Sequence, residues 1–115
     1  MMARIEIVKD FGFEAAHKDG ARTYGFSYRV EIAVAGEIAA DGKLAPFGVI
    51  ERALVPVRRS LDHSVLNEIH ALARPTLENL AIWIGEQLKM DLPGLSRVSV
   101  FRESEGEACH LTFRV

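Results

Sequence analysis

Residues 27–38 read SYRVEIAVAGEI, and this stretch decides the fold because apolar and polar side chains alternate along it. The apolar side chains of one face are Tyr28, Val30, Ile32 and Val34. This period of two predicts a strand with one buried face. Residues 5–13 alternate more weakly and predict a second, antiparallel strand. Residues 15–25 between them contain two glycines and break both the strand and the helix periods, so we expect a loop there.

Two helices are predicted downstream of this strand pair. Apolar residues recur at helical spacing over residues 47–61, and we expect a kink at Pro56 because proline removes an amide donor. A second helix opens at Pro75-Thr76, with Thr76 as the expected N-cap and a buried stripe over residues 77–88. Glu78 stands in the first turn of this helix, where a carboxylate is favoured by the helix dipole.

The last part of the chain predicts two more strands, residues 97–104 and 108–115, joined by a short polar link. The element order is therefore ββααββ. We expect an α+β fold in which residues 1–115 form a single domain, with both helices on one face of a four-stranded antiparallel sheet. The exposed edges of such a sheet favour edge-to-edge assembly.

Length and composition limit which classes of protein this chain can belong to and which partners it can bind. The length of 115 residues and the apolar fraction of 49% suit one compact domain. A net charge of −2 with interspersed signs leaves no basic face for nucleic acid. No apolar run predicts a signal peptide or a membrane span, so we expect a soluble cytoplasmic protein. The single cysteine, Cys109, excludes an intrachain disulfide and is expected to be a buried small residue.

Five blocks of the sequence resemble, in order and spacing, the 6-pyruvoyl- and 6-carboxytetrahydropterin synthase family. They are FEAAH at residues 13–17, SYRV at 27–30, LDHSVLN at 61–67, PTLENLA at 75–81 and RES at 102–104. Together they span almost the whole chain. The resemblance implies the pterin-binding tunnelling fold of that family, whose subunits assemble into a ring or barrel. We therefore expect a small-molecule pterin as partner and a homo-oligomer, either a trimer or a hexamer made of two trimers.

The resemblance also implies where a metal site would lie. In the family, a histidine that ends the first block and a His-Gly-His triplet before the second strand together hold zinc. Here only His17 is retained, and the triplet reads Tyr24-Gly25-Phe26. Gly20 stands at the position of the family's catalytic cysteine. Because a neutral phenol and a phenyl ring do not replace imidazole as zinc ligands, we expect a divergent member with no metal and no cofactor.

Other site residues of the family are retained. Asp62 and His63 match an aspartate and a histidine that act as a proton shuttle, a role that suits imidazole because it titrates near neutrality. An ordinary pair at a helix C-terminus is the structural alternative. Glu103 resembles the glutamate that grips the pterin, since a carboxylate accepts two parallel hydrogen bonds from an amino group and a ring N–H. Family spacing would place Arg102 in that slot instead, so a one-residue bulge is needed to bring Glu103 into it.

Three further residues are substrate-binding candidates through the resemblance alone. Thr76 and Glu78 also have a complete explanation as helix-start residues, and Tyr24 could replace a lost polar group. We expect a zinc-independent enzyme that acts on the side chain of a dihydropterin by lyase or epimerase chemistry, such as retro-aldol cleavage. The alternative is a non-catalytic protein that binds a pterin or a purine-like ligand and has a regulatory role. The missing cysteine and histidines argue against the zinc-assisted synthase reactions of the family.

Overall fold

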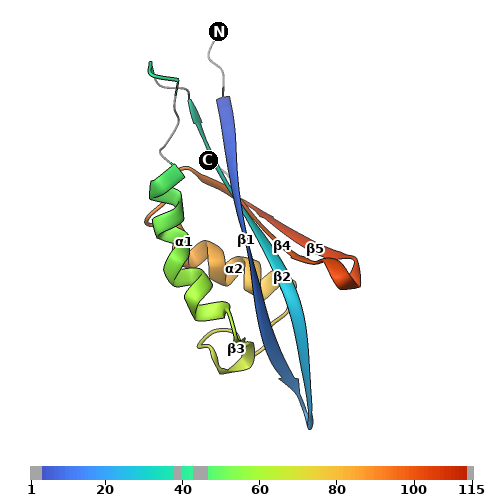
Figure 1. Cartoon of the computed structure of the whole chain (residues 1–115). Helices are drawn as coiled ribbons and strands as arrows, with labels where there is room; N and C mark the ends of the chain where they lie inside the picture. The colour runs from blue at the N-terminus through green and yellow to red at the C-terminus, as the bar shows by residue number, and fades with distance from the viewer. Residues whose placement is uncertain (1–3, 38–39, 43–46, 114–115) are drawn as a thin grey trace.

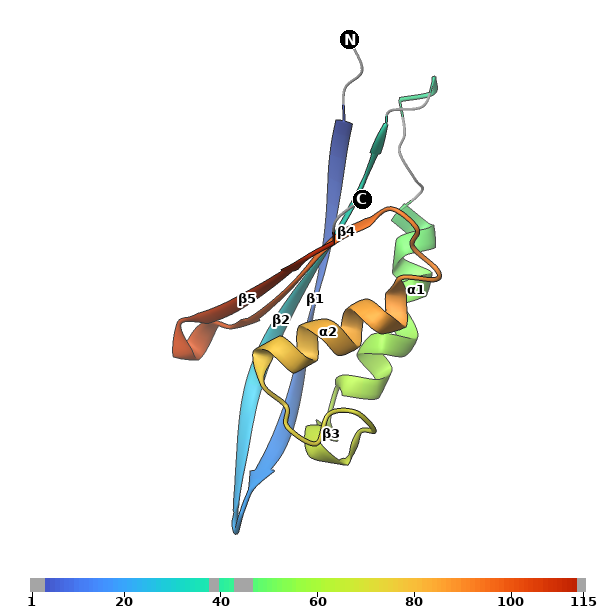
Figure 2. The same ribbon diagram turned by 180° about the vertical axis from the view of Figure 1, so that it is seen from behind.

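The computed structural model describes residues 4–37, 40–42 and 47–113, and it has two helices on one face of a five-stranded sheet (Figures 1 and 2). The strands are β1 (Arg4–Asp19), β2 (Arg22–Glu37), β3 (Ser64–Val65), β4 (Leu95–Arg102) and β5 (Glu107–Thr112). The helices are α1 (Phe47–Leu61) and α2 (Leu77–Leu88), with short 3₁₀ turns η1 (Leu66–Glu68) and η2 (Glu103–Glu105). The sheet order is β3-β1-β2-β4-β5. The α+β class is confirmed, while the predicted strand ends at Ile38, Arg114 and Val115 lie outside the described residues.

β1 and β2 form one long hairpin, so the loop predicted at residues 15–25 is wrong. Their residues pair without interruption from Arg4 opposite Glu37 to Asp19 opposite Arg22. The turn between them consists of Gly20 and Ala21 only. Gly20 has a φ of 61°, which glycine adopts without strain and which the first position of a two-residue type II′ turn requires.

The sheet is mixed, which corrects the prediction of four antiparallel strands. β3 is a two-residue strand that runs parallel to β1, with Ala15 opposite Ser64 and Ala16 opposite Val65. The other strand pairs are antiparallel as predicted. Two residues are too few to carry a period of two, so the sequence offers no signal for this fifth strand.

Both helices form where the sequence predicts them. α1 has the predicted bounds and contains Pro56. Thr76 is the N-cap of α2, since its Oγ1 accepts a hydrogen bond from the Asn79 N–H at 3.1 Å. α1 packs against β1, and α2 packs against β4 and β5 (Figure 2).

The two faces of the sheet differ in chemistry. The face toward the helices is apolar, and its buried side chains include Tyr28, Val30, Ile32, Val34, Val98 and Val100, as the alternation in β2 predicts. The opposite face carries ion pairs between strands. Arg97 contacts Glu6 and Glu31 at 3.3 Å each. The core therefore lies on one side of the sheet only.

No helix in the described ranges is long and apolar enough to cross a membrane.

Cys109 on β5 is half-buried rather than fully buried, and this burial raises the pKa of its thiol above the usual value.

Candidate functional site

The segment after α1 lies along the edge of β1 and supplies hydrogen bonds to it. Asp62 Oδ1 accepts from the Glu14 N–H at 2.9 Å, and the His63 N–H donates to the Glu14 carbonyl at 2.6 Å. Farther along the same edge, the Asn67 side chain bonds both backbone groups of Lys18, at 2.7 and 3.0 Å. Because unpaired edge groups need partners, Asp62 and Asn67 fix this segment in register against β1 on either side of β3.

Asp62 and His63 lie side by side without a direct hydrogen bond. His63 Nε2 is 3.8 Å from Asp62 Oδ1, beyond hydrogen-bond distance. The backbone N–H of Glu14 lowers the pKa of the Asp62 carboxyl, and the nearby His63 and Arg58 lower it further, against a smaller opposing effect of burial. Asp62 is therefore a fixed anion near neutral pH, and it lies beside the His63 imidazole.

His63 has an unusual backbone for a residue with a side chain. Its φ is 59°, in the left-handed region that non-glycine residues rarely adopt. The hydrogen bond from the His63 N–H to the Glu14 carbonyl holds the backbone in this conformation. The side chain is 79% exposed. The turn thus presents an accessible imidazole immediately after the end of α1.

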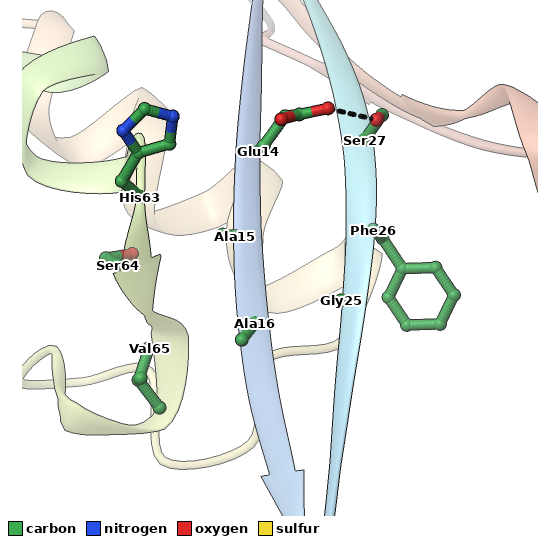
Figure 3. A pocket seen from close by; sticks show the side chains of 9 residues that line it. All are labelled: Glu14, Ala15, Ala16, Gly25, Phe26, Ser27, His63, Ser64 and Val65. Carbon is green, nitrogen blue, oxygen red and sulfur yellow. Dashed lines mark hydrogen bonds between the residues drawn. The ribbon is translucent and has the colours of Figure 1, made fainter.

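A hollow of about 470 Å³ lies beside this imidazole, bounded by β1, β2 and β3 (Figure 3). Its polar lining includes Glu14, Ser27 and His63, and the Glu14 carboxylate accepts a hydrogen bond from Ser27 Oγ at 2.8 Å. The small residues Ala16 and Gly25 lie opposite each other in the strand pair and leave room above the sheet. Sequence reasoning did not select Glu14 or Ser27, although both stand inside blocks that resemble the family.

The positions of the implied metal site come together as three rings. The His17 ring centroid lies 5.5 Å from that of Tyr24 and 5.5 Å from that of Phe26. The zinc of the family does not fit these side chains, because two of the three offer no imidazole nitrogen. Within the described ranges, no group of three or more His, Cys, Asp and Glu side chains could hold a metal ion.

Arg102 and Glu103 diverge at the end of β4, and the one-residue bulge that Glu103 would need to match the family's spacing is not formed there. β4 pairs regularly with β5 up to Arg102, and η2 follows at once. The Arg102 guanidinium lies 4.8 Å from the Phe26 ring centroid. Glu103 instead accepts a hydrogen bond from Arg29 Nε at 2.9 Å and is 65% exposed. Arg102, not Glu103, therefore contacts the aromatic group around His17.

The predicted site residues do not all converge within the single chain. β3 and β4 are separated in the sheet by β1 and β2, so His63 and Glu103 stand about 14 Å apart by strand spacing alone. The Thr76 hydroxyl is engaged as the helix cap. Glu78 lies near Cys109 and contributes to the raised pKa of that thiol, after burial. Tyr24 is 36% exposed beside His17.

Comparisons with known proteins agree on one family. A family model described as 6-pyruvoyl tetrahydropterin synthase matches residues 6–113. The chain is 32% identical over 109 residues to the dihydroneopterin monophosphate aldolase of Pyrococcus furiosus, covering 89% of this chain and 93% of the relative. It is 34% identical over 122 residues to the 6-carboxy-5,6,7,8-tetrahydropterin synthase of a Synechocystis species, covering 95% of each.

Solved structures agree with the fold. The 6-pyruvoyl tetrahydropterin synthase of Caenorhabditis elegans superposes with a TM-score of 0.89 at 17% identity, over 98% of both chains. The corresponding synthase of Plasmodium vivax gives a TM-score of 0.71 at 16% identity, over 96% of this chain and 99% of the other. At this level of identity the likeness concerns the architecture.

Proposed function

The chain belongs to the 6-pyruvoyl tetrahydropterin synthase family, and from that premise we propose that it is a lyase that cleaves the side chain of a 7,8-dihydropterin without zinc, by a retro-aldol reaction. One observation carries the proposal: the aspartate and histidine of the family remain beside a hollow, while two metal-ligand positions hold Tyr24 and Phe26. The relative named as an aldolase supports this reaction class.

The proposed reaction breaks the bond between the first and second side-chain carbons of the dihydropterin. A base removes the proton of the hydroxyl on the second carbon, and the outer part of the side chain leaves as an aldehyde. The electron pair stays on the first carbon, delocalised into the dihydropterin ring, until an acid returns a proton to that carbon. The products are the aldehyde and a 6-hydroxymethyl dihydropterin, and neither an oxidant nor a reductant is needed.

His63 is the proposed group that moves this proton. Its imidazole is accessible, lines the hollow and belongs to the side-chain class that transfers protons near neutral pH. Asp62 is a positioning residue, because its carboxylate lies 3.8 Å from His63 Nε2 and anchors the segment through the Glu14 N–H. The Glu14 carboxylate in the same hollow is a second candidate for acid–base work.

We propose that the complete site forms between subunits of a trimer or hexamer. The separation of β3 from β4 supports this, because Glu103 of one subunit then serves a site whose His63 belongs to another. In this arrangement Glu103 anchors the pterin, with Thr76, Glu78 and Tyr24 as further contacts. In the described part of the chain, the outer edge of β5 at one end of the sheet order and the β1 edge before Gly12 at the other have no strand paired with them and are available for such assembly.

The test uses the purified protein with its metal content measured. Incubation with 7,8-dihydroneopterin or its monophosphate should produce 6-hydroxymethyl-7,8-dihydropterin and the two-carbon aldehyde, detected by chromatography, and chelator treatment should leave the rate unchanged. His63→Gln should lower the rate about 10²-fold or more, as loss of a general acid–base group does. Loss of activity on chelation, restored by zinc, would contradict the metal-free reaction.

A non-catalytic pterin-binding role is the second candidate. The 3.8 Å separation of Asp62 and His63 favours it, because an active dyad normally shares a hydrogen bond. The same incubation separates the two functions. Tight pterin binding without any turnover would leave only the binding role.

A further inference from the structure

Three buried polar atoms lack a hydrogen-bond partner in the described part of the chain, and all three surround one ring. They are His17 Nδ1, Tyr28 Oη and Arg102 Nε. The ring is Phe26, whose centroid lies 5.5 Å from the His17 ring, 6.3 Å from the Tyr28 ring and 4.8 Å from the Arg102 guanidinium carbon. Buried polar atoms almost always have a partner, so a cluster of exceptions indicates a group that is missing from the protein alone.

The three side chains share one chemistry, because each offers a hydrogen to a ligand. Arginine donates only. Burial raises the pKa of Tyr28, and Arg102 only partly offsets this through its charge and a contact with the hydroxyl that falls short of hydrogen-bond geometry, so the hydroxyl keeps its proton near neutral pH. Histidine donates from Nδ1 in one of its two tautomers.

The charge of the cluster is balanced before any ligand binds. Arg102 Nη2 donates to the Glu107 carboxylate across the β4–β5 pair, while Nε is left without a hydrogen-bond partner. Phe26, Tyr28 and His17 alternate along the hairpin with Gly25, Ser27 and Glu14, so the donors lie on the helix side of the sheet and the polar lining of the hollow lies on the other side. The donors therefore lie across the sheet from the hollow of the same chain, which agrees with the site between subunits proposed above.

We propose that His17, Tyr28 and Arg102 form a donor site that binds hydrogen-bond acceptor atoms of the substrate, with the Phe26 ring packed between them. The site lies where the implied metal would be and replaces its positive charge by N–H and O–H groups. The identity of the substrate as a dihydropterin rests on the function proposed above. Two parts of such a molecule carry acceptors without donors: the 4-oxo and N5 edge of the ring, which resembles the guanine edge that arginine reads, and the phosphate of a phosphorylated side chain.

The experiment measures dissociation constants for 7,8-dihydroneopterin, its monophosphate and inorganic phosphate, by fluorescence and calorimetry. Arg102→Gln should weaken pterin binding about tenfold or more, and Tyr28→Phe should weaken it a few-fold, as expected for a charged and a neutral hydrogen bond. Tyr28→Phe keeps the ring that stacks on Phe13 at 4.8 Å, so the fold is not at risk. Arg97→Gln is the matched control on the opposite face of β4, since Arg97 is buried to a similar degree, and it should change binding less than twofold.

The pattern across probes identifies the acceptor. If both pterins lose affinity equally in the variants, the donors bind the ring edge. If only the monophosphate and inorganic phosphate lose affinity, the donors bind the phosphate. Either result supports the proposal. Unchanged constants in both folded variants, or no binding of any probe to the unmodified protein, would overturn it. Arg102-dependent binding without aldol products refutes the proposed reaction alone. Turnover with the same KM in Arg102→Gln refutes the donor site alone.

Discussion

Replacing His63 by glycine and by alanine should separate the chemistry of the imidazole from the strain of its backbone. The φ of 59° places a Cβ close to the following carbonyl, which costs about 1 kcal/mol for alanine and nothing for glycine. The side chain is 79% exposed, so its removal sacrifices little buried area. His63→Gly should therefore be more stable than His63→Ala by about 1 kcal/mol, or about 4 °C in Tm for a domain of this size.

Activity should respond differently from stability. Both variants lack the imidazole, so both should lose about 10²-fold or more in kcat, although their free energies of unfolding differ. Urea unfolding and a chromatographic rate assay on the same samples provide the two measurements. Ala71→Gly is the control, because Ala71 also has a positive φ, of 73°, and lies outside the proposed site; it should gain stability without changing the rate.

Two results would refute this reasoning. Substantial activity in His63→Gly would remove the imidazole from the proposed proton transfer. Equal stability of the glycine and alanine variants would mean that the turn relaxes, so that the bond from the His63 N–H to Glu14 does not hold the left-handed conformation.

Three other predictions concern acid stability, metal and assembly. The pKa of Asp62 is lower in the folded state than in the unfolded state, so the carboxylate stabilises the fold above the unfolded value of about 3.9 and this contribution is lost as pH falls through the folded pKa. Asp62→Asn should therefore make the free energy of unfolding, measured in urea, fall less steeply below about pH 4. The same fall in the variant and the unmodified protein would contradict this. The purified protein should contain no stoichiometric zinc, and one zinc per chain would refute this. The double variant Tyr24→His with Phe26→His should bind zinc, and its free energy of unfolding should rise by about 2.7 kcal/mol when free zinc is at about a hundred times its Kd. Sedimentation should give a trimer or hexamer, and a stable monomer at micromolar concentration would exclude a site shared between subunits.

The sequence predicted the helices well and the hairpin poorly. Apolar residues at helical spacing and a capping threonine identify α1 and α2 because each signal is local and repeated. Residues 23–28 also alternate, with rings at Tyr24, Phe26 and Tyr28, but in the sequence Gly25 interrupts this pattern as a strand breaker would. In the structure a Cβ at Gly25 would meet open space, so this glycine is an ordinary strand residue. One glycine, Gly20, suffices for the turn.

The sequence likewise predicts some features of the candidate site and not others. Alternation along β4 correctly places Arg102 and Glu103 on opposite faces, but only the folded structure shows which of them contacts Phe26. The edge-binding role of Asp62 depends on a backbone N–H of Glu14, 48 residues away, and no side-chain pattern encodes that partner. Tyr28 looks like an ordinary core residue in the sequence, and only its unpartnered hydroxyl distinguishes it.

The length of the β1–β2 hairpin has a consequence for the order in which the chain folds. Its pairs begin beside the turn, at Asp19 and Arg22, and each later pair closes only a small additional loop, so the ladder can zip on the microsecond scale typical of hairpins. The contact of Asp62 with Glu14 must instead close 48 residues and comes later. Pulse-labelling hydrogen exchange during refolding should accordingly show that the amides bonded between β1 and β2 become protected first. The amides of Glu14 and Lys18, which face outward from β1 toward Asp62 and Asn67, should become protected later. On this prediction, the hairpin is the template on which the rest of the chain assembles, and the segment that carries Asp62 and His63 is among the last parts to reach its place.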